Sequence, residues 1–228
     1  RHVVICLGAG MNVISLATGK MIARAANASQ ALKEVAVSPD GRHVVTGGGW
    51  IWNGKMIRTG DYRARIWRLP ESVSRPQREI QLVAKLPGHR GSGAGHSALA
   101  VSADGGYVLS GGGDDRTAKL WDVAQRKQVV TMATSASASA VALSSDGKLA
   151  AAASFDGQVY IWNLESGKPV HTMTQGERNS AAIAFSPDSR MLITVAGDGA
   201  ACAWDVETGD AMVKTDLGSY GWDCFVLA

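Results

Sequence analysis

Four segments of the chain share one pattern of apolar and polar positions: an apolar alternation, a four-residue turn and a second apolar run. They are VAVSPDGRHVVTGG from Val35, LAVSADGGYVLSGG from Leu99, VALSSDGKLAAAAS from Val141 and IAFSPDSRMLITVA from Ile183. Alternation with a period of two is typical of strands, and Pro and Asp early in a turn with Gly late favour a tight β-turn. Each segment therefore predicts a β-hairpin.

A second pattern follows each hairpin, a short apolar run that contains tryptophan six residues after an aspartate. The tryptophans are Trp67, Trp121, Trp162 and Trp204, and the aspartates are Asp61, Asp115, Asp156 and Asp198. The turn serines Ser102, Ser144 and Ser186 are 42 residues apart, whereas 64 residues separate Ser38 from Ser102. Four strands in each repeat of about 42 residues predict the blades of a β-propeller.

These motifs together resemble the Trp-Asp (WD) repeat family of β-propellers, over nearly the whole chain. The resemblance implies a structural hydrogen-bonded set in each blade, made of the Trp, the Asp, a second-strand Ser or Thr and a preceding His. Thr46, Ser110 and Thr194 match the hydroxyl position, but Ala152 replaces it in the fourth repeat. Only His89 and His96 follow a glycine as the family's histidine does, and both fall in one loop. Most blades should therefore lack the full set.

The resemblance and the repeat phase together predict a single domain over residues 1–228, an all-β WD-repeat propeller of about five four-stranded blades. The expected blades are residues 223–228 with 1–27, 31–70, 97–133, 139–174 and 181–216. Strands from both termini would share the first blade and close the ring, which removes exposed sheet edges. The alternative is a fragment of a seven-bladed propeller.

The repeats are irregular around the second blade, where two insertions are expected, residues 47–60 and 71–95. In the family, loops after the second and the fourth strands emerge on the same, top face, so both insertions should stand together where blades two and three meet. Loop Trp and Arg concentrate binding energy at interfaces. The candidate contact residues are Trp50, Trp52, Lys55, Arg58, Tyr62, Arg63, Arg75, Arg78 and Arg90. The structural alternative is a stray strand whose Trp packs inward.

The distribution of charged residues along the chain adds to this prediction. The whole chain carries a formal net charge of +3, but Lys55 to Arg90 holds nine cations and three anions. From Asp198 to the end there are six anions and one cation. Such a polarised field can steer an anionic partner toward one side of the molecule.

Little in the chain indicates catalysis. Gly49 to Lys55 fits the spacing of a phosphate-binding loop, but Met56 stands where the magnesium-binding hydroxyl should be. Cys6, Cys202 and Cys224 cannot all pair, which favours a reducing, cytoplasmic compartment. We expect no metal, no cofactor and no membrane span.

The predicted function is a non-catalytic scaffold that binds other proteins through top-face loops, with an acidic partner surface at blades two and three. The alternatives are an enzyme or ligand-binding propeller that uses its loops or central channel, and binding of nucleic acid or another polyanion by residues 55–90.

Overall fold

The structure is a computed structural model. It describes residues 2–7, 10–16, 18–25, 32–38, 42–48, 50–52, 56–58, 64–69, 78–86, 89, 98–176 and 180–218, some of them by their backbone alone. These residues form 22 strands and no helix. The strands of the described residues group into five four-stranded sheets and one two-stranded sheet, which confirms the all-β class.

The first two sheets are formed by the N-terminal third of the chain and the segment before residue 86. The first sheet has the order β1 (His2–Leu7), β2 (Gly10–Ser15), β3 (Met21–Ala25), β9 (Arg78–Glu79). The second sheet has the order β4 (Leu32–Val37), β5 (His43–Gly48), β8 (Arg65–Arg68), β10 (Gln81–Lys85).

The other three sheets follow the chain without rearrangement, each strand antiparallel to the next. The third sheet is β11 (Leu99–Val101), β12 (Tyr107–Gly111), β13 (Thr117–Asp122), β14 (Lys127–Ala133). The fourth is β15 (Ala138–Leu143), β16 (Leu149–Ser154), β17 (Gln158–Asn163), β18 (Pro169–Thr174). The fifth is β19 (Ser180–Phe185), β20 (Met191–Ala196), β21 (Ala200–Asp205), β22 (Ala211–Asp216). A regular repeat of strand, turn and strand therefore gives a regular row of sheets.

The turns between the first and second strands repeat one side-chain arrangement. Ser144 Oγ donates to Asp146 Oδ1 over 2.7 Å and accepts from the N–H of Leu149 over 2.9 Å. Ser102 and Ser186 make the corresponding bonds. The predicted hairpins are thus closed by the serine and the aspartate of their own turn, as turn chemistry favours.

The fourth strand of the second sheet lies within the segment that the sequence analysis treats as an insertion. β10 pairs antiparallel with β8, and β9, just before it, pairs in parallel with β3 of the first sheet. Ile80, between β9 and β10, is 4% exposed and belongs to the core that joins both sheets. Residues 71–95 are therefore not insertion throughout, because part of them completes one sheet and extends another.

Four apolar clusters hold neighbouring sheets together, and each contains one of the repeated tryptophans. Trp67 belongs to the cluster between the first and second sheets, and Trp121 to that between the second and third. Trp162 lies between the third and fourth sheets, and Trp204 between the fourth and fifth. All four are 6% exposed or less. Each repeated tryptophan thus packs its blade against the preceding one, where burial of a large apolar side chain contributes about 1.5–3 kcal/mol.

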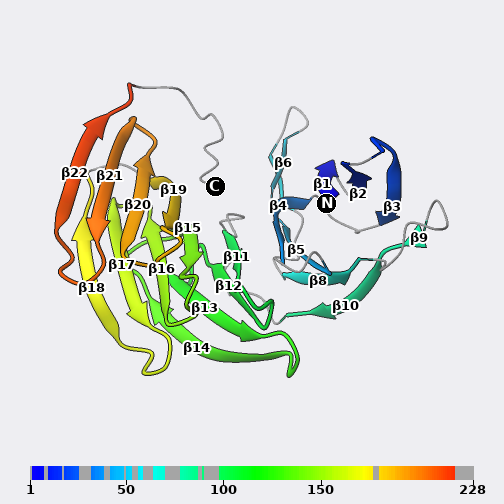
Figure 1. Cartoon of the computed structure of the whole chain (residues 1–228), viewed down its shortest axis with the longest axis horizontal. Coiled ribbons are helices and arrows are strands. Elements are labelled where there is room, and N and C mark those ends of the chain that lie inside the picture. The colour runs from blue at the N-terminus through cyan, green and yellow to red at the C-terminus, as the bar shows by residue number, and fades with distance from the viewer. Residues whose placement is uncertain are drawn as a thin grey trace.

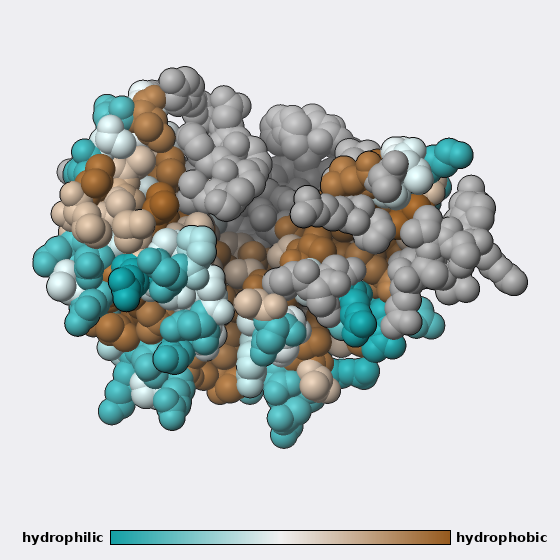
Figure 2. Space-filling view, viewed as in Figure 1, coloured by the Kyte–Doolittle hydropathy of each residue, from teal (hydrophilic) through white to brown (hydrophobic). Residues whose placement is uncertain are grey.

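The five sheets follow one another around a central region in chain order (Figure 1). Contacts join β1 to β4, β4 to β11, β11 to β15 and β15 to β19, so the edge strand that comes first in each sheet lines the inner side. The outer strands β14 and β18 expose apolar as well as polar side chains, and the lower rim in Figure 2 is accordingly a mixture of hydrophilic and hydrophobic residues. The expected closing strand, residues 223–228, lies outside the described residues, so closure of the ring stays a prediction.

Candidate interaction surface

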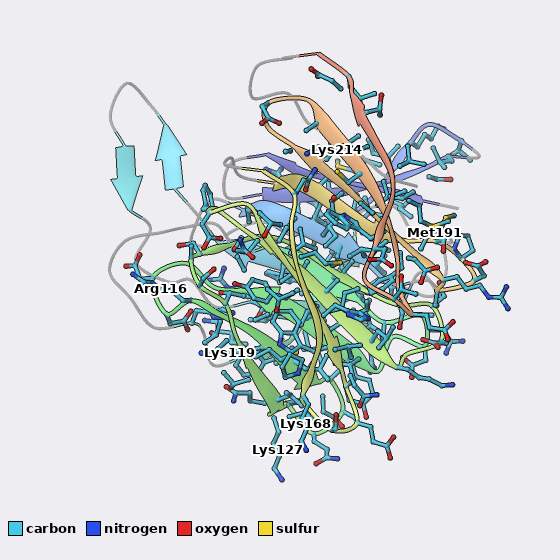
Figure 3. All side chains as sticks on the ribbon, turned by 90° about the vertical axis from the view of Figure 1, so that its left-hand side faces the viewer. Arg116, Lys119, Lys127, Lys168, Met191 and Lys214 are labelled. Atoms are coloured by element: carbon cyan, nitrogen blue, oxygen red, sulfur yellow. The ribbon has the colours of Figure 1, made fainter. Side chains whose placement is uncertain are left out.

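The ends of the second and third sheets carry the loops that the sequence singles out. We call the b–c face the end of these sheets at which β5 connects to β8 and β12 connects to β13. The first of these connections contains a separate two-stranded sheet, β6 (Trp50–Trp52) and β7 (Met56–Arg58). In Figure 3 this hairpin projects beyond the sheets, and Arg116, in the second connection, lies on the same side.

A hydrogen-bonded chain of side chains stands beneath this face in the third sheet. Trp121 Nε1 donates to Ser110 Oγ over 2.8 Å, and Ser110 Oγ lies 2.8 Å from His89 Nε2. His89 Nδ1 lies 3.0 Å from a carboxylate oxygen of Asp115. The chain thus connects the buried indole of the third strand to the turn at the b–c face.

The protonation of His89 follows from its surroundings. Burial lowers the pKa of His89 below its usual 6.5, although Asp115 acts in the opposite direction. A neutral ring that donates from Nδ1 to Asp115 accepts at Nε2, where the hydroxyl of Ser110 donates. Lys119 Nζ, 3.0 Å from Asp115 Oδ2, supplies the positive charge that balances the carboxylate.

This network also joins two segments that are far apart in sequence. His89 follows β10, whereas Asp115 lies between β12 and β13. Their contact brings the loop after the fourth strand of the second sheet to the b–c face, as expected for loops of this kind. An added Cβ at Gly112 would overlap with both Asp115 and His89, so the contact also requires a glycine here.

The other sheets keep parts of the same arrangement. Trp67 Nε1 donates to Thr46 Oγ1 over 2.8 Å, and Trp204 Nε1 donates to Thr194 Oγ1 over 2.9 Å. In the fourth sheet Ala152 has no hydroxyl to offer, and the ring of Trp162 stacks on Tyr160 with centroids 5.3 Å apart and an interplanar angle of 14°. The buried indoles are therefore held in two different ways.

Where histidine is missing, other polar side chains link the same strands. In the fourth sheet Ser135 Oγ donates to Asp156 and lies 2.6 Å from the hydroxyl of Tyr160, and Ser154 also donates to Asp156. These serines lower the pKa of Asp156 against the opposing effect of burial, which is the largest single contribution. In the fifth sheet Gln175, 1% exposed, donates its amide to the carbonyl of Ala200 over 2.8 Å. Sequence reasoning missed Ser135, Tyr160 and Gln175, because these residue types have no fixed place in the repeat.

Four of the predicted contact residues lie in described strands, and three of them, Trp50, Trp52 and Arg58, lie in the β6–β7 hairpin. Trp50 pairs with Arg58 and Trp52 with Met56, so these positions share one face of the hairpin. The hairpin is a sheet of its own rather than a strand added to the blade. Outside the described residues lie the remaining candidates and two repeat positions: Lys55, Tyr62, Arg63, Arg75, Arg90, Asp61 and His96.

Arg78 does not join the hairpin. It lies in β9, opposite Ala23 at the outer edge of the first sheet. Arg75 precedes β9 in the chain and so belongs to the connection from β8 to β10. Because successive strands are antiparallel, that connection starts at the end of the sheet opposite the b–c face. The expectation that both inserted segments stand together is therefore wrong for Arg78 to Ile80, and it stays a prediction for the inserted residues that lie outside the described ranges.

No group of three or more His, Cys, Asp or Glu residues in the described ranges could hold a metal ion. The same residues include no helix long and apolar enough to cross a membrane.

Comparison with known proteins shows similarity to WD-repeat proteins. The family model "WD domain, G-beta repeat" matches residues 80–122, 126–163 and 167–205, more than half of the chain. Periodic tryptophan protein 2 homolog of Schizosaccharomyces pombe is 34% identical over 89 residues, which are 39% of this chain. The matched region is 10% of that protein's length.

Proposed function

Because the chain belongs to the WD-repeat family of β-propellers, we propose that it is a non-catalytic platform that binds an acidic protein segment at the b–c face. WD repeats generally mediate protein–protein interaction, and propeller blades supply a rigid frame on which variable loops carry specificity. The separate β6–β7 hairpin and the residues around it indicate which face of this chain binds and what kind of partner.

The observation that carries the proposal is the β6–β7 hairpin. It belongs to none of the four-stranded sheets, so the blade does not need it for its own strand pairing. It projects from the b–c face (Figure 3). An extra, separately paired element at a loop end is the kind of feature that binding surfaces use.

The composition of this connection indicates the partner. Residues 49–64 contain Trp50 and Trp52, three cations (Lys55, Arg58 and Arg63) and one anion (Asp61), with Tyr62 beside them. Arg90 follows His89, whose ring is bound to Asp115 of the next sheet. Aromatic and basic residues together suit a segment with carboxylates and apolar side chains. Arg75 and Arg78 are left out of this surface, because they precede β10.

The proposal is tested by selecting binders from a random-peptide display library on the immobilised chain. We expect enrichment of Asp and Glu in the selected peptides, and at least tenfold weaker binding when Lys55, Arg58 and Arg63 are all changed to Glu. The matched control changes Lys148, Lys168 and Arg190 to Glu, since all three are exposed in connections at the opposite end of the sheets. Equal loss in both variants, or selection of peptides without acidic residues, would contradict the proposal.

Nucleic acid is the competing polyanion. A labelled DNA duplex bound more tightly than the selected peptides, with affinity that falls steeply with salt, would replace the protein partner by nucleic acid.

A further inference from the structure

The turn between β12 and β13 differs from its counterparts in one residue. Arg116 has φ +49°, whereas the equivalent turns of the fourth and fifth sheets have Gly157 at φ +80° and Gly199 at φ +93°. All three donate the same backbone hydrogen bond across the turn, Arg116 to the carbonyl of Gly113 over 3.1 Å. A residue with a Cβ is disfavoured in this left-handed conformation, so glycine would serve the turn better.

The surroundings of Arg116 do not explain its presence. Its side chain is exposed. The carboxylate next to it in sequence, Asp115, is bonded to His89 and to Lys119. Asp114, on its other side, is exposed. Within the described part of the chain, Arg116 makes no ion pair, so its charge faces outward from the b–c face.

Its position puts it in reach of the surface described above. Arg116 lies in the connection of the third sheet that corresponds to the hairpin connection of the second, and the two sheets pack through β4 and β11. In Figure 3 Arg116 and the hairpin lie on the same side of the molecule. The His89–Asp115 contact places His89, in the connection that follows β10, beside the same turn.

We propose that Arg116 is a specificity-determining contact of the b–c face, whose guanidinium pairs with a carboxylate of the acidic segment that docks beside the hairpin. The inference rests on the proposed function and adds to it a residue of the neighbouring blade. A guanidinium binds a carboxylate through two parallel N–H donors, which a lysine cannot do.

The chain contains a matched control for this residue. Arg126, at the other end of β13, also has a left-handed φ, +56°, and also stands where the equivalent turns have glycine, Gly167 and Gly209. It is exposed as well. Arg116→Gly and Arg126→Gly therefore remove the same charge and the same backbone strain, but only the first lies at the b–c face.

The experiment measures binding of a fluorescent twelve-residue glutamate peptide to the full chain by anisotropy, with a glutamine peptide and a twelve-base single-stranded DNA as comparison. We expect Arg116→Gly to weaken glutamate-peptide binding at least fivefold and Arg126→Gly less than twofold. Both variants should unfold at the same temperature as the wild type or higher, because glycine relieves the strain. Arg116→Lys should recover only part of the affinity.

Each other outcome overturns a distinct statement. Equal binding by the wild type and Arg116→Gly, or equal losses in the two glycine variants, contradicts the role of Arg116 while the proposed surface stands. A wild type that binds no glutamate peptide removes the acidic partner and the inference with it. Tighter DNA binding that Arg116→Gly reduces assigns the residue to a nucleic-acid partner instead.

Discussion

Trp121 donates its indole N–H to the hydroxyl of Ser110 over 2.8 Å, and each of the two residues is 2% exposed. Because Ser110 also donates to His89, a single hydroxyl connects the core between the second and third sheets with the b–c face. The stability of the third sheet and the position of His89 thus depend on one small side chain.

Removing that hydroxyl should destabilise the chain. In Ser110→Ala the indole N–H and His89 Nε2 both lose their partner in a buried place, at a cost of about 1–3 kcal/mol. Urea unfolding followed by tryptophan fluorescence measures the change. Ser166→Ala is the control, since Ser166 bonds to Asn163 in an exposed turn. A loss no larger than that of the control would show that the buried chain adds nothing to stability.

His89 should make the stability of the chain depend on pH. Its folded pKa is lowered by burial, so the unfolded state takes up a proton first as the pH falls below the usual 6.5. The stabilisation is therefore complete above that value and is lost on acidification toward the folded pKa. We expect the melting temperature to fall more between pH 7.5 and 5.5 in the wild type than in His89→Asn.

The comparison with His89→Asn isolates this residue, because the other four histidines are the same in both proteins. A melting temperature that instead rises on acidification in the wild type alone would mean that Asp115 dominates and that His89 is charged when folded.

The fourth sheet allows a test of its replacement network. Tyr160 is 9% exposed, and its hydroxyl bonds to both the Oγ and the N–H of Ser135, at 2.6 and 3.0 Å. Tyr160→Phe keeps the ring that stacks on Trp162 and removes these bonds, so it should cost about 1 kcal/mol. Tyr160→Ala also loses the stacked ring and should cost about 3 kcal/mol or more.

Thermal unfolding of both variants separates the two contributions. Tyr107→Phe, at a position 38% exposed, should change stability by less than about 0.5 kcal/mol. If Tyr160→Phe were as harmless as this control, Ser135 and Asp156 would be satisfied without the tyrosine.

What could be predicted from the sequence depends on how local each interaction is. The hairpins closed by Ser102, Ser144 and Ser186 follow from turn chemistry within six residues, and the repeat phase then identifies the WD-repeat family and the all-β fold. The strand β10 was missed because it follows β8 only after a long connection, without the short turn containing Gly167 or Gly209 that precedes β18 and β22. The sequence alone does not show that the connection from β8 to β10 starts at the end of the sheet opposite the b–c face.

The residues of the candidate site also differ in how far the sequence predicts them. The extra residues between β5 and β8 stand out as an interruption of the repeat, but nothing in their sequence tells a separate hairpin from an added strand. Arg116 carried a signal that was overlooked: a turn whose counterparts contain Gly157 and Gly199 has arginine instead. The sequence contains no such signal for Gln175, because an amide that bonds to backbone carbonyls does not need a fixed position in the repeat.

Gln175 provides the last prediction. Its Nε2 donates to the carbonyls of Ala200 and Thr194, 2.8 and 3.3 Å away, and thereby joins β20 to the start of β21. Gln175→Met keeps the length of the side chain but leaves both carbonyls without this donor, which should cost about 1–3 kcal/mol. Gln175→Glu should cost more, because it buries a charge that repels the same oxygens.

Gln125→Met, in an exposed turn, is the matched control. Hydrogen exchange should show the loss first in β20 and β21, since local opening follows the site of the lost bonds. Protection lost evenly over all five sheets would contradict this local role.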